Sequence, residues 1–219
     1  MVSFEDVKNN TDIQAYIIKA DESLAAIGYT EHHFAHVMKV ASVSGEILRK
    51  LGYPEREAEL AMIAGYMHDI GNLVNRVDHS QSGAVMCFRI LDKMGMDAEE
   101  IATVVTAVGN HDEGTGVAVN EVAAALIIAD KTDVRRSRVR SGESVTFDIH
   151  DRVNYAVTDS EICIDTDSRE LTLKLTIDGK YCSVADYFEI FLERMLMCRR
   201  AAEKLALRFG LSINGQIMM

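Results

Sequence analysis

The sequence predicts a mainly α-helical fold: a helical bundle followed by a β-hairpin and one long amphipathic helix. Apolar residues recur at helical spacing through most of residues 15–133, and the helical segments have start or stop signals. Period-two alternation is confined to residues 161–177, where it indicates half-buried strands. With 219 residues, of which 48% are hydrophobic, the chain can bury one substantial core.

Six helices are expected before residue 142. Thr11 fits a capping box in front of the first helix, Thr30 can cap the second, and Pro54 suits the first turn of the third. The third helix is expected to stop just before Gly71. The predicted helices cover residues 15–26, 31–50, 55–69, 80–94, 98–108 and 121–133.

The pattern changes after about Gly142. In residues 170–177 every second position is leucine or isoleucine and the positions between them are polar, which is typical of a strand with one buried face. Residues 161–166 alternate in a similar way, so the two segments predict a β-hairpin, and a long amphipathic helix is expected after it. We therefore expect a helical domain over residues 1–142 and an appendage over residues 143–219, with its helix over residues 183–209, packed on the same core or at a dimer interface.

Composition and charge exclude several kinds of function. A net charge of −11 argues against nucleic acid as the main partner, because a phosphate backbone calls for a basic face. No apolar run is long enough to span a bilayer, the N-terminus lacks the layout of a signal peptide, and the four cysteines show no CxxC spacing. We therefore expect a cytoplasmic protein with no membrane partner. A homodimer is also expected, because an exposed apolar helix face usually seeks a partner.

Polar residues interrupt apolar helical segments near their ends. Asp130 follows the apolar residues 123–129, and a carboxylate in such a place costs several kcal/mol unless a cation or strong donors meet it. His68 and Asp69 follow another apolar segment just before Gly71, where the end of a helix lets both side chains turn inward. This placement suits a histidine that binds one metal ion and a carboxylate that bridges two.

The ordered set His36, His68-Asp69 and Asp130 resembles the signature of the HD superfamily of metal-dependent phosphohydrolases. That signature has a lone histidine on one helix, a His-Asp pair on the next and a distant aspartate at the end of a third. The separations here are 32 residues from His36 to His68 and 61 from Asp69 to Asp130. The resemblance covers roughly residues 20–135 and implies an HD-domain helical bundle as the catalytic domain, with His68 and Asp69 as catalytic residues.

His79 and His111 match, in order and context, the two extra histidines of HD members that have a dinuclear centre. These members include the bacterial enzymes that cleave diadenosine tetraphosphate and the HD-GYP phosphodiesterases. Ligation by both histidine and carboxylate favours divalent or mixed-valent transition metals over magnesium, with Fe or Mn foremost and Co, Ni or Zn as alternatives. The resemblance implies two such ions held by His36, His68, Asp69, His79, His111 and Asp130.

A cluster of this kind implies hydrolysis of a phosphate ester. Two cations about 3.5–4 Å apart can share a hydroxide, lower the pKa of water and neutralise phosphoryl oxygens during attack. Asp69 is expected to bridge the two ions. The expected substrate is a phosphomonoester or phosphodiester, either a nucleotide or another small phosphorylated metabolite.

One departure from the dinuclear relatives concerns the substrate. Several of them carry lysine three residues after the aspartate of the pair, whereas Asn72 occupies that place here and brings no positive charge. His33 falls where some relatives carry arginine, and Lys131 and a run of arginines follow Asp130 closely. The expected substrate contacts are His33, Asn72, Lys131, Arg135, Arg136 and Arg138.

Other interpretations of the same residues stay open. The metal ligands could be buried polar groups paired with one another, and the arginine run could be a solvated face or an inter-subunit set of salt bridges. His32 is expected on the surface of a first helical turn, and His150 is expected to be structural. The cluster could also hold a diiron centre that activates oxygen, or the chain could be a regulatory module that binds a nucleotide without turnover.

Overall fold

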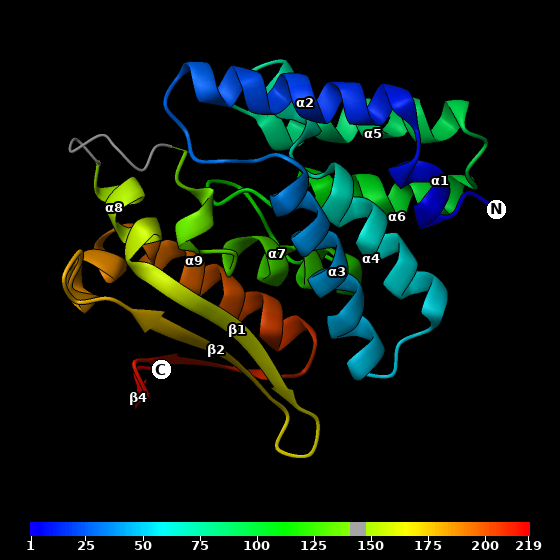
Figure 1. Cartoon of the computed structure of the whole chain (residues 1–219). Coiled ribbons are helices and arrows are strands. Elements are labelled where there is room, and N and C mark those ends of the chain that lie inside the picture. The colour runs from blue at the N-terminus through cyan, green and yellow to red at the C-terminus, as the bar shows by residue number, and fades with distance from the viewer. Residues whose placement is uncertain (141–147) are drawn as a thin grey trace.

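The computed structural model describes residues 1–140 and 148–219 (Figure 1). The predicted boundary between a helical domain and an appendage, at residues 142 and 143, lies outside the described residues. The mainly α-helical class is confirmed, with a small sheet in the C-terminal part. The helices are α1 (Phe4–Lys8), α2 (Thr11–Ala26), α3 (Phe34–Lys50), α4 (Glu55–Met67), η1 (Ile70–Leu73), α5 (His79–Lys93), α6 (Ala98–Gly109), α7 (Glu121–Lys131), η2 (Arg136–Arg138), α8 (Ile149–Ala156) and α9 (Val184–Lys204).

The starts of α2 and α3 differ from the prediction. Asn10 caps α2, because its side-chain oxygen accepts hydrogen bonds from the amides of Asp12 and Ile13, so this helix begins at Thr11. Before α3 the chain is held by carboxylates: Asp21 accepts from the amide of His32 at 2.8 Å, and Glu31 accepts from that of His33 at 2.6 Å. The helix therefore begins only at Phe34, and His32 lies in the preceding loop.

The end of α4 also differs from the prediction and positions functional residues. This helix ends at Met67, and the chain tightens into η1, whose Asn72 amide donates to the carbonyl of Asp69 at 3.0 Å. His68 and Asp69 thus lie in the turn between the two helices. Gly71 of η1 lies against α5, since a Cβ on it would come 2.0 Å from the carbonyl oxygen of His79.

Helices α3, α4 and α7 form the centre of the bundle, with α7 surrounded by its neighbours (Figure 1). Residues 122–129 of α7 are all buried, and the helix contacts α3, α4, α6 and α9. Gly65 allows α3 and α4 to approach closely, because a Cβ on it would come 2.8 Å from the Cα of Ala41. This close packing brings the ends of three helices together on one side of the core.

The C-terminal part contains the predicted hairpin and a sheet that was not predicted. Its strands are β1 (Val157–Asp165), β2 (Glu170–Ile177), β3 (Arg208–Ile213) and β4 (Gln216–Ile217) in the order β1-β2-β3-β4. β1 and β2 are antiparallel, whereas β2 and β3 are parallel, with α9 as the crossover between them. The two edges of the sheet are therefore the nine-residue β1 and the two-residue β4.

The predicted helix over residues 183–209 is wrong at its C-terminal end. α9 ends at Lys204, and Ala206 has a left-handed backbone with φ of 56° that turns the chain into β3. Among the described residues, no helix combines the length and the apolarity that crossing a membrane requires.

Candidate metal centre

Four of the predicted ligands meet where α3, α4 and α7 converge. His36 lies in the first turn of α3, and the Nε2 atoms of His36 and His68 are 3.3 Å apart. Oδ1 of Asp130, in the last turn of α7, lies 3.4 Å from Nε2 of His36 and 3.6 Å from that of His68. Oδ2 of Asp69 lies 3.2 Å from Nε2 of His68 and 3.7 Å from that of His36. Two imidazoles and two carboxylates therefore surround one point.

The other two predicted ligands lie on the opposite side of Asp69. His79 is the first residue of α5, and His111 follows α6. Their Nε2 atoms are 3.1 Å apart, and Oδ1 of Asp69 lies 3.4 Å from Nε2 of His79 and 3.9 Å from that of His111. The two oxygens of the Asp69 carboxylate thus face two different pairs of imidazoles.

All four imidazoles point Nε2 at the cluster because Nδ1 has an acceptor behind it. Carbonyl and carboxylate acceptors place the proton on Nδ1, which leaves the Nε2 lone pair free for a cation. Two Nε2 atoms 3.1–3.3 Å apart require either a proton or a metal cation between them, and this set of donors fits a transition metal. The Nδ1 acceptors are Asp133 for His36 at 2.8 Å, Gly65 O for His68 at 2.8 Å, Arg76 O for His79 at 3.1 Å and Val108 O for His111 at 2.6 Å.

Asp133, which the sequence did not single out, is the one side-chain carboxylate among these acceptors. It is buried just after α7, where Nζ of Lys39 and Nε of Arg135 reach its Oδ1 at 3.0 and 2.8 Å. Burial alone would raise the pKa of Asp133, but the bond from His36 and the nearby cations hold it well below its usual range. Asp133 therefore stays anionic and fixes the orientation of His36.

The electrostatics of the cluster favour a bound cation. Burial alone would raise the pKa of Asp69 and Asp130, but His68 beside the first and Lys131 beside the second hold both pKa values well below the usual range. Burial would lower the pKa of His68, yet the two carboxylates raise it to about 10. Burial, with the charges of His68 and Lys131, lowers the pKa of His111 to about 3. Both carboxylates are thus anionic, which is the form that binds a metal ion.

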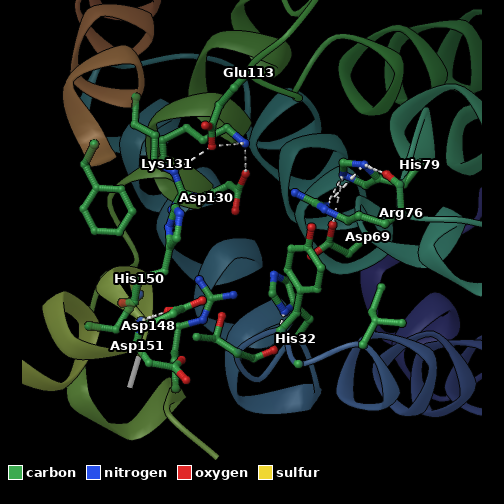
Figure 2. A pocket seen from close by; sticks show the side chains of 18 of the residues that line it. His32, Asp69, Arg76, His79, Glu113, Asp130, Lys131, Asp148, His150 and Asp151 are labelled. Atoms are coloured by element: carbon green, nitrogen blue, oxygen red, sulfur yellow. Dashed lines mark hydrogen bonds and ion pairs between the residues drawn. The ribbon is translucent and has the colours of Figure 1, made fainter. Parts of the chain in front are cut away.

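A cavity of about 460 Å³ opens beside the cluster, and its lining includes Asp69, Asp130, His79 and His111. Figure 2 shows Asp69 and His79 close to Arg76, and Asp130 close to Lys131 and Glu113. Two of the predicted substrate contacts, Lys131 and Arg138, also line the cavity. Nζ of Lys131 lies 2.8 Å from Oδ2 of Asp130 and 3.6 Å from a carboxylate oxygen of Glu113. A volume of this size holds a small ligand.

Two of the other predicted substrate contacts, Asn72 and His33, do not line this cavity. Asn72 is buried, and its Nδ2 donates to Oδ1 of Asp69 at 3.0 Å, so its amide orients the bridging carboxylate instead of facing the cavity. His33 is the residue directly before α3.

Arg135 and Arg136 do not line the cavity either. The Nε of Arg135 donates to Asp133 at 2.8 Å, behind His36. The Nε of Arg136 donates to the carbonyl of Tyr155 at 2.6 Å, and its guanidinium lies 4.4 Å from that ring's centroid. These two arginines hold neighbouring segments together.

Several cavity residues were not predicted. His32, expected on the surface, lines the cavity, and its Nδ1 lies 2.7 Å from the carbonyl of Thr30. His150 lines it from α8, and Arg76 and Arg194 line it from the loop before α5 and from α9. These residues lie far apart in sequence without a shared motif, so only the tertiary fold could reveal them.

Comparisons with known proteins identify the family of the chain. No curated protein matches the chain. The solved structure of a predicted HD superfamily hydrolase from an uncultured Thermotogales bacterium is 24% identical, with 57% of this chain and 67% of that chain covered and a TM-score of 0.44. The HD domain family matches residues 33–190, which is more than half of the sequence, and the chain therefore belongs to the HD domain family.

Proposed function

We propose that this protein hydrolyses a phosphate ester with the help of two transition-metal ions. The observation that carries the proposal is the position of Asp69, whose two carboxylate oxygens face two separate pairs of imidazoles. His36, His68 and Asp130 would hold one ion, and His79 and His111 would hold the other. Asp69 would be shared by both.

The ions supply Lewis acidity, which lowers the pKa of water and offsets the charge of the phosphoryl group. The protein's own part is to hold the ligands in place: Asp133 orients His36, and Asn72 orients Asp69. The mixture of imidazole and carboxylate ligands favours Fe or Mn, with Co, Ni or Zn as alternatives.

The substrate class is a phosphomonoester or phosphodiester of nucleotide size. The cavity of about 460 Å³ lies within the range of sites for small molecules. The cationic Arg76 on its wall, which forms no ion pair with a described carboxylate, attracts an anionic substrate. A nucleotide or another small phosphorylated metabolite meets these conditions.

The test combines metal analysis with a substrate panel. The purified protein is stripped with a chelator, reloaded separately with Fe, Mn, Co, Ni and Zn, and assayed on phosphomonoesters and phosphodiesters for release of phosphate or alcohol. We expect two ions per chain and metal-dependent release that Asp69→Ala and His68→Ala abolish. Asp92→Asn, an exposed residue of α5, is the matched control and keeps full activity.

Two results would contradict the proposal. Substrate-dependent oxygen uptake with iron, without phosphate release, would indicate an oxygenase. Tight nucleotide binding without turnover under any metal would indicate a regulatory module.

A further inference from the structure

Four cationic side chains line the cavity beside the cluster: Arg76, Lys131, Arg138 and Arg194. Three of them have carboxylate partners. Lys131 contacts Asp130 at 2.8 Å, Arg138 lies 3.9 Å from Asp133, and Arg194 contacts Glu113 at 2.6 Å. Arg76 has no carboxylate within ion-pair distance in residues 1–140 and 148–219, so its positive charge is not neutralised by the described part of the protein.

Arg76 belongs to the short segment between η1 and α5 and lies next to the His79 side of the cluster (Figure 2). Its Nη1 lies 3.2 Å from Nε2 and 3.3 Å from Nδ1 of His79, and 3.5 Å from the side-chain oxygen of Asn72. Its guanidinium carbon lies 5.3 Å from the centroid of the Tyr29 ring, which also lines the cavity. The aromatic ring and the imidazole hold the guanidinium at the edge of the cavity without supplying a negative charge.

The contact between Arg76 and His79 conflicts with metal binding. The lone pair on Nε2 of His79 cannot serve both a metal ion and an Arg76 donor. Nδ1 of His79 cannot accept from Arg76 either, because it carries a hydrogen that it donates to the backbone carbonyl oxygen of Arg76, 3.1 Å away. In the metal-loaded protein Nη1 of Arg76 would keep only the long 3.5 Å contact to the side-chain oxygen of Asn72, which leaves a hydrogen for an acceptor in the adjacent cavity.

Asn72 lies close to Arg76 but faces away from the cavity. Its amide is turned to the backbone carbonyl and side chain of Asp69, at 2.9 and 3.0 Å, and it is buried, so it does not present a donor to the cavity. Arg76, four residues further along the chain, does reach the cavity wall. Of these two residues, only Arg76 presents a donor to the cavity.

We propose that Arg76 is the phosphate-binding residue of this site and that its guanidinium contacts the phosphoryl oxygens on the His79 side of the cluster. The proposal rests on the function proposed above. A guanidinium presents parallel N–H donors that match two oxygens of a phosphate, and such charge-assisted bonds are among the strongest hydrogen bonds in proteins. The charges of the other three cations already have carboxylate partners: Asp130 for Lys131, Asp133 for Arg138 and Glu113 for Arg194.

The experiment measures binding of inorganic phosphate to the metal-loaded protein by titration calorimetry, in the wild type and in Arg76→Gln, Arg76→Lys and Arg89→Gln. Arg89 is an exposed arginine of α5 and serves as the matched control. We expect Arg76→Gln to weaken phosphate binding roughly ten- to a hundredfold, because the variant loses one charged hydrogen-bonding group. Arg76→Lys should restore part of this loss, because it keeps the charge but not the paired donors. Arg89→Gln should bind as the wild type does.

Metal content and melting temperature are measured for each variant, and kinetics are added if a substrate has been found. Unchanged phosphate affinity in Arg76→Gln, or a wild type that binds no phosphate, would overturn the inference while leaving metal-dependent hydrolysis intact. Loss of a metal ion from Arg76→Gln would also overturn it, since Arg76 would then act through His79. A different result is also possible: no member of the substrate panel is hydrolysed, yet phosphate binding still depends on Arg76. That result would overturn the proposed function but support Arg76 as an anion-binding residue.

Discussion

The two halves of the candidate metal centre are built differently. On the His36–His68 side, both imidazoles are fully buried, with His36 in the first turn of α3 and His68 directly after the end of α4, which packs closely on α3. His36 is held by Asp133, which in turn contacts Lys39 and Arg135. This half is fixed by helix packing and a network of charged side chains.

On the His79–His111 side, the imidazoles come from the beginning of α5 and the turn after α6. Both imidazoles are oriented by backbone carbonyls that accept from their Nδ1 atoms. The side chain of Asp112, which follows His111, is 28% exposed, so solvent reaches close to this side. Asp78, which precedes His79, has a left-handed backbone with φ of 56°. His79 and His111 are buried too, at 2% and 1% exposed, but short connecting segments open more readily than packed helices. We therefore expect the first half to bind its ion more tightly than the second.

The largest expected effect comes from the residue that both halves share. Asp69→Ala should remove both ions, whereas His111→Ala should remove one ion and leave the other in place. Removal of a residue that only orients a metal ligand costs up to about a hundredfold in activity. Because Asp69 is itself a proposed ligand, the activity of Asp69→Ala should fall by more than about a hundredfold. Metal content per chain, measured by elemental analysis, checks the difference. A His111→Ala protein that retains no metal would show that the halves are not independent.

The second prediction concerns the close approaches that hold each half. A Cβ at Gly65 would meet the Ala41 backbone at 2.8 Å, and one at Gly71 would meet backbone atoms of His79 and Gly83 at 2.0 and 2.4 Å. Either alanine substitution should lower the free energy of unfolding by about 1–3 kcal/mol or more, because backbone must move. Gly71→Ala should have the greater effect. Urea unfolding checks this, with Gly179→Ala as control, since nothing lies within 4 Å of that position.

The third prediction tests the network behind His36. Asp133→Asn keeps an acceptor for Nδ1 but loses the charge, and should weaken metal binding on this side by about ten- to a hundredfold. Asp112→Asn is the matched change on the other side, where Asp112 lies 3.9 Å from Nε2 of His79. Competition with a coloured chelator measures both affinities. Equal, small effects in the two variants would remove the proposed difference between the halves.

The smallest effect is expected away from the cluster, in the metal-free protein. Burial would raise the pKa of Asp21, but hydrogen bonds from Arg140 and the His32 amide outweigh it and hold the pKa below its ordinary value of 3.8. A lowered folded pKa stabilises the protein above the unfolded pKa, and this contribution is lost as the pH falls through the folded value. Asp21→Asn should therefore cost about 1–3 kcal/mol at pH 7.

The gap in unfolding free energy between wild type and Asp21→Asn should narrow as the pH falls below about 3.8. Urea unfolding of the apoprotein at several pH values measures it. Glu22→Gln, in an exposed pair with Lys19 on the same helix, is the control and should lose much less. A gap that stays constant down to the lowest pH would contradict the assigned role of Asp21.

The sequence was sufficient to predict the elements that depend on local pattern. Six helices and the hairpin follow from periodicity, and the six predicted ligands are brought together by the fold. The ends of elements were less predictable. The start of α3 is set by side-chain carboxylates that accept hydrogen bonds from the amides before it: Asp21, from α2, bonds the His32 amide, and Glu31, from the loop itself, bonds the His33 amide. The predicted helix over residues 183–209 included the first two residues of β3, and the rest of this strand was not predicted.

The cavity wall could not be predicted for a different reason. His32, Arg76 and Arg194 belong to three segments that meet only in the folded chain, and none of them has a motif of its own. Arg135 and Arg136 lie close to Asp130 in sequence, but their side chains turn to Asp133 and Tyr155. The homodimer stays a prediction, which a measurement of molecular mass in solution tests.

The edges of the small sheet have a consequence for solubility. An exposed strand edge is a template on which another chain can add a strand, and proteins limit this with charged or very short edge strands. β1 carries Asp159, Glu161 and Asp165 along its length, and β4 has only two residues. Two copies pairing antiparallel about Glu161 would place that carboxylate opposite itself. The protein is thus built to resist edge-to-edge aggregation at both sides of its sheet.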